Sequence, residues 1–64
     1  MDDDNNLREK SRRVRGMHIN LTSTDSGWKA EATDIKDGEV CRAIESADYE
    51  TAEGYYDQLV AEYS

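Results

Sequence analysis

Five cations within eight residues form the group of side chains in this chain that is best suited to binding. Residues 8–15 contain a single acid, Glu9, and their basic members are Arg8, Lys10, Arg12, Arg13 and Arg15. Arginine and lysine attract nucleic-acid phosphates with an affinity that falls as salt rises, and they attract acidic protein surfaces equally well. This segment therefore has four possible roles: it binds nucleic acid, an acidic protein or the chain's own acidic body, or it has no partner at all.

The rest of the chain carries the opposite charge. Residues 16–64 hold eleven acids and three cations, so their net charge is −8, against +1 for residues 1–15 and −7 for the whole chain. Such a body repels phosphate and suits a basic protein partner. Four acids near the C-terminus form the predicted acidic site: Glu50, Glu53, Asp57 and Glu62.

The tyrosines gather in the same C-terminal stretch of 15 residues. Tyrosine buries a large apolar ring while its hydroxyl reaches water, and it is enriched at protein interfaces. The four rings could cover a small core that lacks phenylalanine. We also expect one end of the tyrosine stripe, formed by Tyr49, Tyr56 or Tyr63, to contact a protein partner.

Catalytic and metal-binding patterns are weak. His18 as a base or Cys41 as a nucleophile would need an activating group nearby. Arg42 is next to Cys41 in the sequence, but neighbouring strand residues point to opposite faces. One cysteine and one histidine are too few for a typical zinc site, and no calcium-loop spacing is present. We therefore predict no enzyme activity, no metal site and no cofactor.

Sixty-four residues allow one small domain. Ordering so short a chain costs nearly as much free energy as its apolar burial provides, so self-association, for instance as a homodimer, or a partner is expected to help. The absence of a long apolar run or of a secretory pattern predicts a cytoplasmic protein without a membrane partner. The excess of acids resembles that of salt-loving archaeal proteins, although an acidic mesophile or phage protein could share it.

The first part of the body predicts two β-strands. Met17, Ile19 and Leu21 alternate with polar residues, as a half-buried strand requires. Residues 23–27 supply small polar side chains and a glycine that favour a turn. Residues 28–33 then alternate in the same way.

Asp37-Gly38 is the strongest hairpin signal, because both residues tolerate positive φ at the centre of a two-residue turn. A third strand is predicted over residues 39–45, with Val40 and Ile44 on the same face. Its alternation is less regular than that of the other two strands.

The C-terminal stretch predicts an amphipathic helix that begins after an N-cap at Ser46 or Asp48. Gly54 is expected to weaken the helix or to allow it to approach the sheet closely. The apolar and aromatic positions follow helical spacing: Tyr49, Ala52, Tyr55, Tyr56, Leu59, Val60 and Tyr63.

We therefore predict an α+β fold in which a three-stranded antiparallel β-meander carries one C-terminal α-helix on one face. Residues 16–64 form this small βββα domain, and residues 1–15 form a disordered basic N-terminal arm. The expected core combines the helix stripe with these sheet residues: Met17, Ile19, Leu21, Trp28, Ala30, Ala32, Val40 and Ile44.

With a helical arm, the element order αβββα would resemble the layout of double-stranded RNA-binding domains. The terminal helix of that family presents lysines to phosphate, whereas residues 49–63 present only acids. The βββα part by itself is similar in layout to HicB-type antitoxins. No motif is shared residue by residue, and neither family is assigned.

Two functional hypotheses are compatible with this sequence. The first is a small acidic, non-enzymatic regulatory module that binds a protein, in one version by imitating the phosphates of a nucleic acid. The second is a nucleic-acid-binding regulator that uses the basic residues of 8–15, with the folded part as a dimerisation unit.

Overall fold

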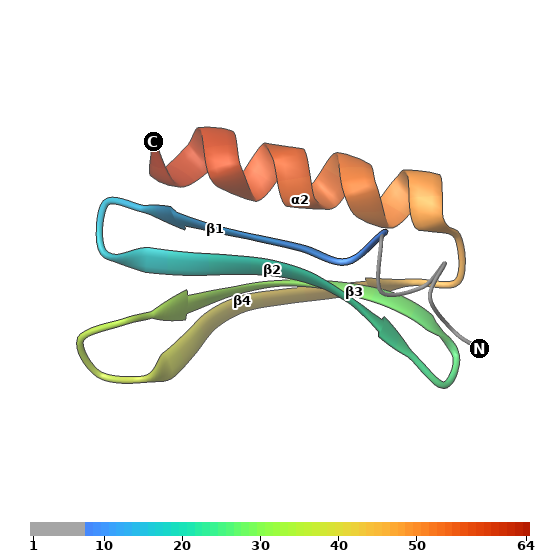
Figure 1. Cartoon of the computed structure of the whole chain (residues 1–64), viewed down its shortest axis with the longest axis horizontal. Helices are drawn as coiled ribbons and strands as arrows, with labels where there is room; N and C mark the ends of the chain where they lie inside the picture. Colours follow the sequence, from blue (N-terminus) through green and yellow to red (C-terminus); the bar gives the residue numbers. More distant parts are fainter. Residues whose placement is uncertain (1–7) are drawn as a thin grey trace.

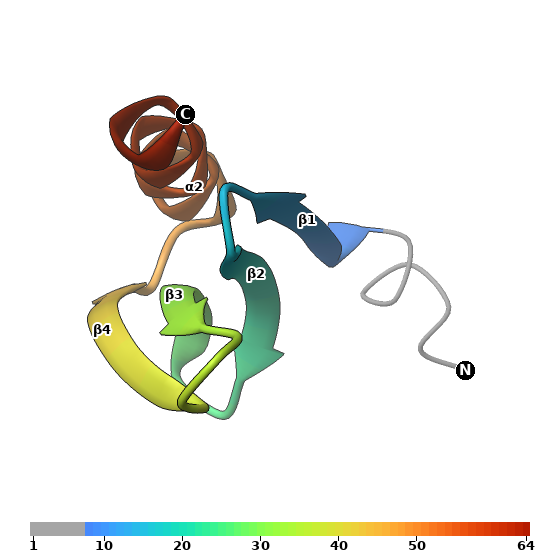
Figure 2. The same ribbon diagram turned by 90° about the vertical axis from the view of Figure 1, so that its left-hand side faces the viewer.

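The computed structural model describes residues 8–64, which form one antiparallel sheet and one helix (Figure 1). The strands are hydrogen-bonded in chain order, and the helix lies across one face of the sheet (Figure 2). This arrangement confirms the predicted α+β class, the antiparallel meander and the C-terminal helix. The elements are β1 (Lys10–Val14), β2 (Met17–Thr24), β3 (Gly27–Asp34), β4 (Glu39–Ser46) and α2 (Tyr49–Tyr63).

The sheet has four strands, so the prediction of three is wrong. Lys10–Val14, which the sequence places within a disordered arm, pairs with β2 along its whole length. The two strands are joined by Arg15 and Gly16, whose φ angles of 49° and 80° are both positive, as in a type I′ turn. This turn matches the twist of the flanking strands, so a mostly polar segment can be held in the sheet. The expected disorder of residues 1–7 lies outside the described residues.

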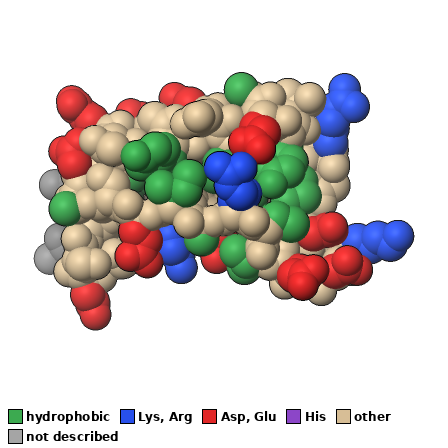
Figure 3. Space-filling view, turned by 180° about the vertical axis from the view of Figure 1, so that it is seen from behind, with side chains coloured by type: hydrophobic (Ala, Val, Ile, Leu, Met, Phe, Trp, Pro, Cys, Tyr) green, Lys and Arg blue, Asp and Glu red, His purple; other side chains and the backbone are tan. Residues whose placement is uncertain are grey.

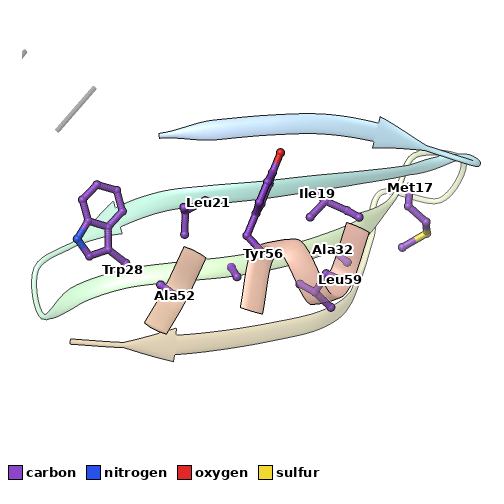
Figure 4. Packing of buried hydrophobic residues seen from close by; sticks show 9 residues of the cluster. Met17, Ile19, Leu21, Trp28, Ala32, Ala52, Tyr56 and Leu59 are labelled. Atoms are coloured by element: carbon purple, nitrogen blue, oxygen red, sulfur yellow. The ribbon is translucent and has the colours of Figure 1, made fainter. Parts of the chain in front are cut away.

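The core lies between the sheet and α2 and largely matches the prediction. Figure 4 shows the aromatic and aliphatic side chains from β2, β3 and α2 meeting in a single layer. The buried residues are Met17, Ile19, Leu21, Trp28, Ala30, Ala32, Ala52, Tyr56 and Leu59. Val14 of β1 also packs against them, which the sequence does not suggest.

Val40 and Ile44 do not share a face, contrary to expectation. Ile44 pairs with the buried Ala30, which places it on the helix side of the sheet. The pairing of β3 with β4 shifts register after Ala32, so Val40 pairs with Thr33 on the opposite side. This irregularity behaves as a β-bulge, in which one extra residue in a strand reverses the facing of the side chains beyond it. Val40 is consequently 50% exposed and lies outside the core.

The hairpin predicted at Asp37-Gly38 exists, but its loop has four residues rather than two. β3 ends at Asp34 and β4 begins at Glu39. Gly38 has a φ of 72° and donates its backbone N–H to the Asp34 carbonyl oxygen at 2.7 Å. The Asp34 side chain in turn accepts a hydrogen bond from the Lys36 backbone N–H at 2.9 Å. The aspartate at the end of the strand therefore organises the loop.

Asp48 is the N-cap of α2, as one of the two alternatives predicted. Its Oδ2 accepts hydrogen bonds from the backbone N–H of Thr51 at 3.0 Å and from its hydroxyl at 2.9 Å. Ser46, the other candidate, accepts from the Asp48 backbone N–H at 3.2 Å and so supports the turn before the cap. Gly54 does not mediate close packing, because a Cβ placed there would meet no atom within 4 Å.

Candidate functional site

The acids of α2 do not form one row, because the helix distributes them over two sides. Glu50, Glu53 and Asp57 are spaced by three and four residues and therefore follow one stripe of the helix surface. Glu62 lies on the side of α2 that faces β4, where it pairs with Arg42 at 3.0 Å. The helix contains no lysine or arginine, so the stripe of three acids is uninterrupted by positive charge from α2 itself.

Glu53 contacts Lys10 of the basic segment, which lies 43 residues earlier in the sequence. Lys10 of β1 donates a hydrogen bond from Nζ to Glu53 Oε2 at 2.5 Å. This bond lowers the pKa of the Glu53 carboxyl below its ordinary value and raises the pKa of Lys10. The side chains of Lys10 and Glu53 remain 39% and 34% exposed, so solvent screens the pair and its contribution to stability is modest.

Tyrosines of α2 complete this junction between β1 and the helix. The Tyr49 hydroxyl lies 3.3 Å from Glu53 Oε2 and 3.4 Å from the Arg8 carbonyl oxygen, and donates to one of them. The Arg8 guanidinium lies 5.2 Å from the centroid of the Tyr49 ring, within cation–π range. Lys10 Nζ lies 5.6 Å from the centroid of Tyr56. Two of the five predicted arm cations therefore contact the chain's own helix.

The other three cations lie in the second half of β1 and in the turn between β1 and β2, and together they are called the arginine corner. Arg12, Arg13 and Arg15 are exposed, and within residues 8–64 none of them takes part in an ion pair. Arg12 and Arg13 point to opposite faces of β1, because neighbouring strand residues alternate. The basic segment is thus divided into a part held by α2 and a part that faces solvent.

The predicted tyrosine site is divided in the same way. Tyr56 is only 7% exposed and extends from α2 into the core toward β1 (Figure 4). Tyr49 is half-buried and packs edge-on against Trp28, with 4.9 Å between ring centroids. Tyr63 is half-buried against the same core. Packing therefore occupies much of the tyrosine surface. Among the predicted protein-binding residues, Glu50, Asp57 and Glu62 are exposed, and Glu62 is paired with Arg42.

His18 and Cys41 are not brought together. They lie in β2 and β4 with β3 between them, and strand spacing separates their backbones by roughly 10 Å. In the part of the chain that the structure describes, no pocket is present and no cluster of three or more His, Cys, Asp or Glu could hold a metal ion. No helix within residues 8–64 is long and apolar enough to cross a membrane.

Two contacts escape the sequence analysis. Glu9, counted only as the single acid of the basic segment, accepts hydrogen bonds from the Ser23 backbone N–H at 3.0 Å and its hydroxyl at 3.2 Å. Arg42 reaches across to Glu62 because it pairs with the inward-facing Ala32 and so projects toward the helix. An arginine between two apolar residues of a predicted strand is the only sequence signal for the second contact.

The fold and the charged surface define a small two-layer α+β domain with an acidic helix outside and a cationic strand at one sheet edge. Comparisons with protein-family models, with curated proteins and with solved structures find no match for this chain. Its function must therefore be argued from its own residues.

Proposed function

We propose that this protein is a non-enzymatic interaction module that binds a basic protein surface through the outward face of α2. The observation that carries the proposal is the stripe of Glu50, Glu53 and Asp57 on a helix without a single cation. Lys10 compensates only Glu53, and within residues 8–64 neither Glu50 nor Asp57 has an ion-pair partner. Exposed charges of one sign steer a partner of the opposite sign and raise its association rate.

A more specific form of this function is imitation of a nucleic acid. Glu50 and Asp57, the two acids of the stripe without an ion-pair partner within residues 8–64, are separated along the helix axis by about 10.5 Å, with the Lys10-paired Glu53 between them in the same line. A DNA- or RNA-binding protein would meet such a line with the arginines and lysines that normally contact phosphate. The module would then occupy that protein and regulate it.

The test is to immobilise the full chain and capture the proteins that bind to it, and to repeat the capture with a variant that lacks only the charges of the two exposed acids Glu50 and Asp57. Glu50→Gln with Asp57→Asn keeps the shape of both side chains and deletes their charge. Asp25→Asn with Asp37→Asn is the matched control, because it removes two exposed turn carboxylates elsewhere. We expect a basic protein to be retained by the intact chain and by the control, and to be lost from the helix variant. Retention of no protein in either low or high salt would contradict the proposal.

The alternative function, binding of nucleic acid, is favoured by the exposed corner of Arg12, Arg13 and Arg15. Three exposed arginines that have no ion-pair partner within residues 8–64 can neutralise phosphates and give an affinity that falls steeply with salt. The acidic body opposes this function, because it would lie within one or two Debye lengths of a bound backbone.

Deletion of residues 1–15 would not test this alternative, because it would remove β1 from the sheet and uncover the edge of β2. Substitution of the three arginines by glutamine keeps the strand. Fluorescence anisotropy with labelled DNA and RNA should show salt-sensitive binding that this variant loses. Equal binding by the variant and the intact chain would reject the arginine corner as the nucleic-acid site.

A further inference from the structure

The two edges of the sheet differ in length and charge. β1 has five residues, and Lys10, Arg12 and Arg13 line it. β4 has eight residues and, within residues 8–64, pairs on one side only, with β3. Unpaired edges invite strand addition, and lysines, arginines and short length are the usual means of preventing it. The β1 edge is protected in this way, whereas the β4 edge is open.

The open edge also exposes apolar side chains. Val40, Cys41 and Ala43 are exposed, and Ile44, on the helix side of the sheet, is half-buried. Figure 3 views the molecule from this side and shows hydrophobic side chains to either side of a basic side chain. Tyr55 belongs to this surface, because it precedes Glu62 by two helical turns and therefore lies on the same side of α2.

We propose that β4 pairs with β4 of a second copy of this chain, antiparallel about a two-fold axis. The result is a continuous eight-stranded sheet that ends at both sides in the cationic β1. Two β1 edges repel each other, whereas β4 carries two acids and one arginine, with Arg42 already neutralised by Glu62. Assembly therefore closes at two, which is the commonest symmetry of soluble oligomers.

The regular part of β4 determines the register. The β-bulge disturbs the strand before Arg42, so the undistorted segment is residues 42–46. Antiparallel pairing of this segment with itself is centred on Ile44, which meets Ile44 of the partner subunit on the helix side. On the opposite face, Ala43 lies across from Glu45 of the partner subunit. No like charges are directly opposed in this register, which satisfies a main requirement of cross-strand pairing.

This register makes position 43 a sensitive test. Ala43 is exposed in the single chain, so a polar side chain is tolerated there. Ala43→Glu would place a carboxylate opposite Glu45 of the partner subunit, and symmetry makes this contact twice. Ala43→Lys would instead create two opposite-charge pairs. Ala61→Glu, an identical change at an exposed position of α2, is the matched control.

Sedimentation velocity at about 0.15 M potassium chloride measures the outcome, because a Debye length of about 8 Å screens the long-range repulsion between two chains of charge −7 but leaves the close contact at position 43 effective. We expect a monomer–dimer equilibrium that Ala43→Glu weakens about tenfold, that Ala43→Lys preserves or strengthens, and that Ala61→Glu leaves unchanged. Circular dichroism of each variant establishes that the single chain still folds. Hydrogen exchange should show concentration-dependent protection of β4 amides.

Four results would overturn the proposal. The intact chain could stay monomeric at high protein concentration. It could form a dimer whose dissociation constant is the same in Ala43→Glu and Ala43→Lys. It could also form a dimer in which only the backbone amides of α2 are protected from hydrogen exchange. It could also form assemblies larger than a dimer, which would show that the β1 edge does not stop growth.

Discussion

Lys10 and Glu53 join the first described strand to the helix, with Nζ of the lysine 2.5 Å from Oε2 of the glutamate. The bond links a residue of the basic segment to the middle of the acidic helix. The positive segment and the negative helix, which the sequence shows as separate regions of opposite charge, are therefore in direct contact in the fold. The same contact removes both side chains from the groups that are freely available to a partner.

We expect this pair to make stability depend on pH in acid. Hydrogen bonding to Lys10 lowers the pKa of Glu53, so its contribution is complete above the ordinary carboxyl pKa and is lost as pH falls through the lowered value. Glu53→Gln should destabilise the protein at neutral pH, and the difference should shrink in acid. Urea unfolding at several pH values measures this effect. Glu50→Gln on the same helix is the control, and an equal pH response in both variants would contradict the assignment.

Gly27 is expected to be intolerant of any side chain. A Cβ there would lie 2.3 Å from the Ser46 carbonyl oxygen and 2.6 Å from the Ala47 Cα, both backbone atoms, and the φ of 148° is unfavourable for L residues. We predict that Gly27→Ala lowers the free energy of unfolding by at least about 2 kcal/mol. Gly54→Ala, in open space within α2, should raise it by about 0.5–1 kcal/mol. Chemical unfolding should show that the free energy of unfolding falls in Gly27→Ala and rises in Gly54→Ala, each compared with the intact chain.

Arg15 occupies a left-handed backbone conformation that is costly for an arginine. Asparagine followed by glycine is the preferred pair for a type I′ turn, so Arg15→Asn should stabilise the protein, by up to about 1 kcal/mol. Thermal unfolding measures the gain. Arg13→Asn removes the same charge from the strand itself and should not stabilise. A loss of stability in Arg15→Asn would show that the guanidinium has a structural contact.

Salt should stabilise the folded chain. Residues 16–64 carry a net charge of −8, and their mutual repulsion weakens as the Debye length shortens. The few ion pairs of residues 8–64 are partly exposed, so salt removes little of their stabilising energy compared with the repulsion that it relieves. The melting temperature should therefore rise from dilute buffer to molar potassium chloride. A melting temperature that is insensitive to salt would argue against adaptation to a salty environment.

The strands and the helix were predictable wherever one face is buried against the other layer. Ile19, Leu21 and Ala30 alternate with polar residues because the helix covers one side of the sheet, and Leu59 follows helical spacing for the same reason. The strand β1 was missed because its side chains are mainly polar and only Val14 reaches the core. Its stability comes from backbone hydrogen bonds to β2 and from the turn that joins the two strands. Neither feature produces a recognisable pattern of apolar residues in the sequence.

The candidate site was predictable as chemistry but not as geometry. The acids, cations and tyrosines were all identified, yet the sequence could not indicate that Lys10 would engage Glu53 or that Glu62 would turn toward Arg42. Those partners are far apart along the chain. Only the packing of α2 on the sheet selects which of them meet.

The sequence by itself determined the charge contrast, the element types from Met17 onward and most of the core, because these depend on local periodicity and composition. Within residues 8–64, the tertiary structure decided which sheet edge is open, which face Val40 occupies and which acids have no ion-pair partner. These features depend on strand pairing and on a one-residue register shift, and a shift of one residue reverses the side to which every later side chain points.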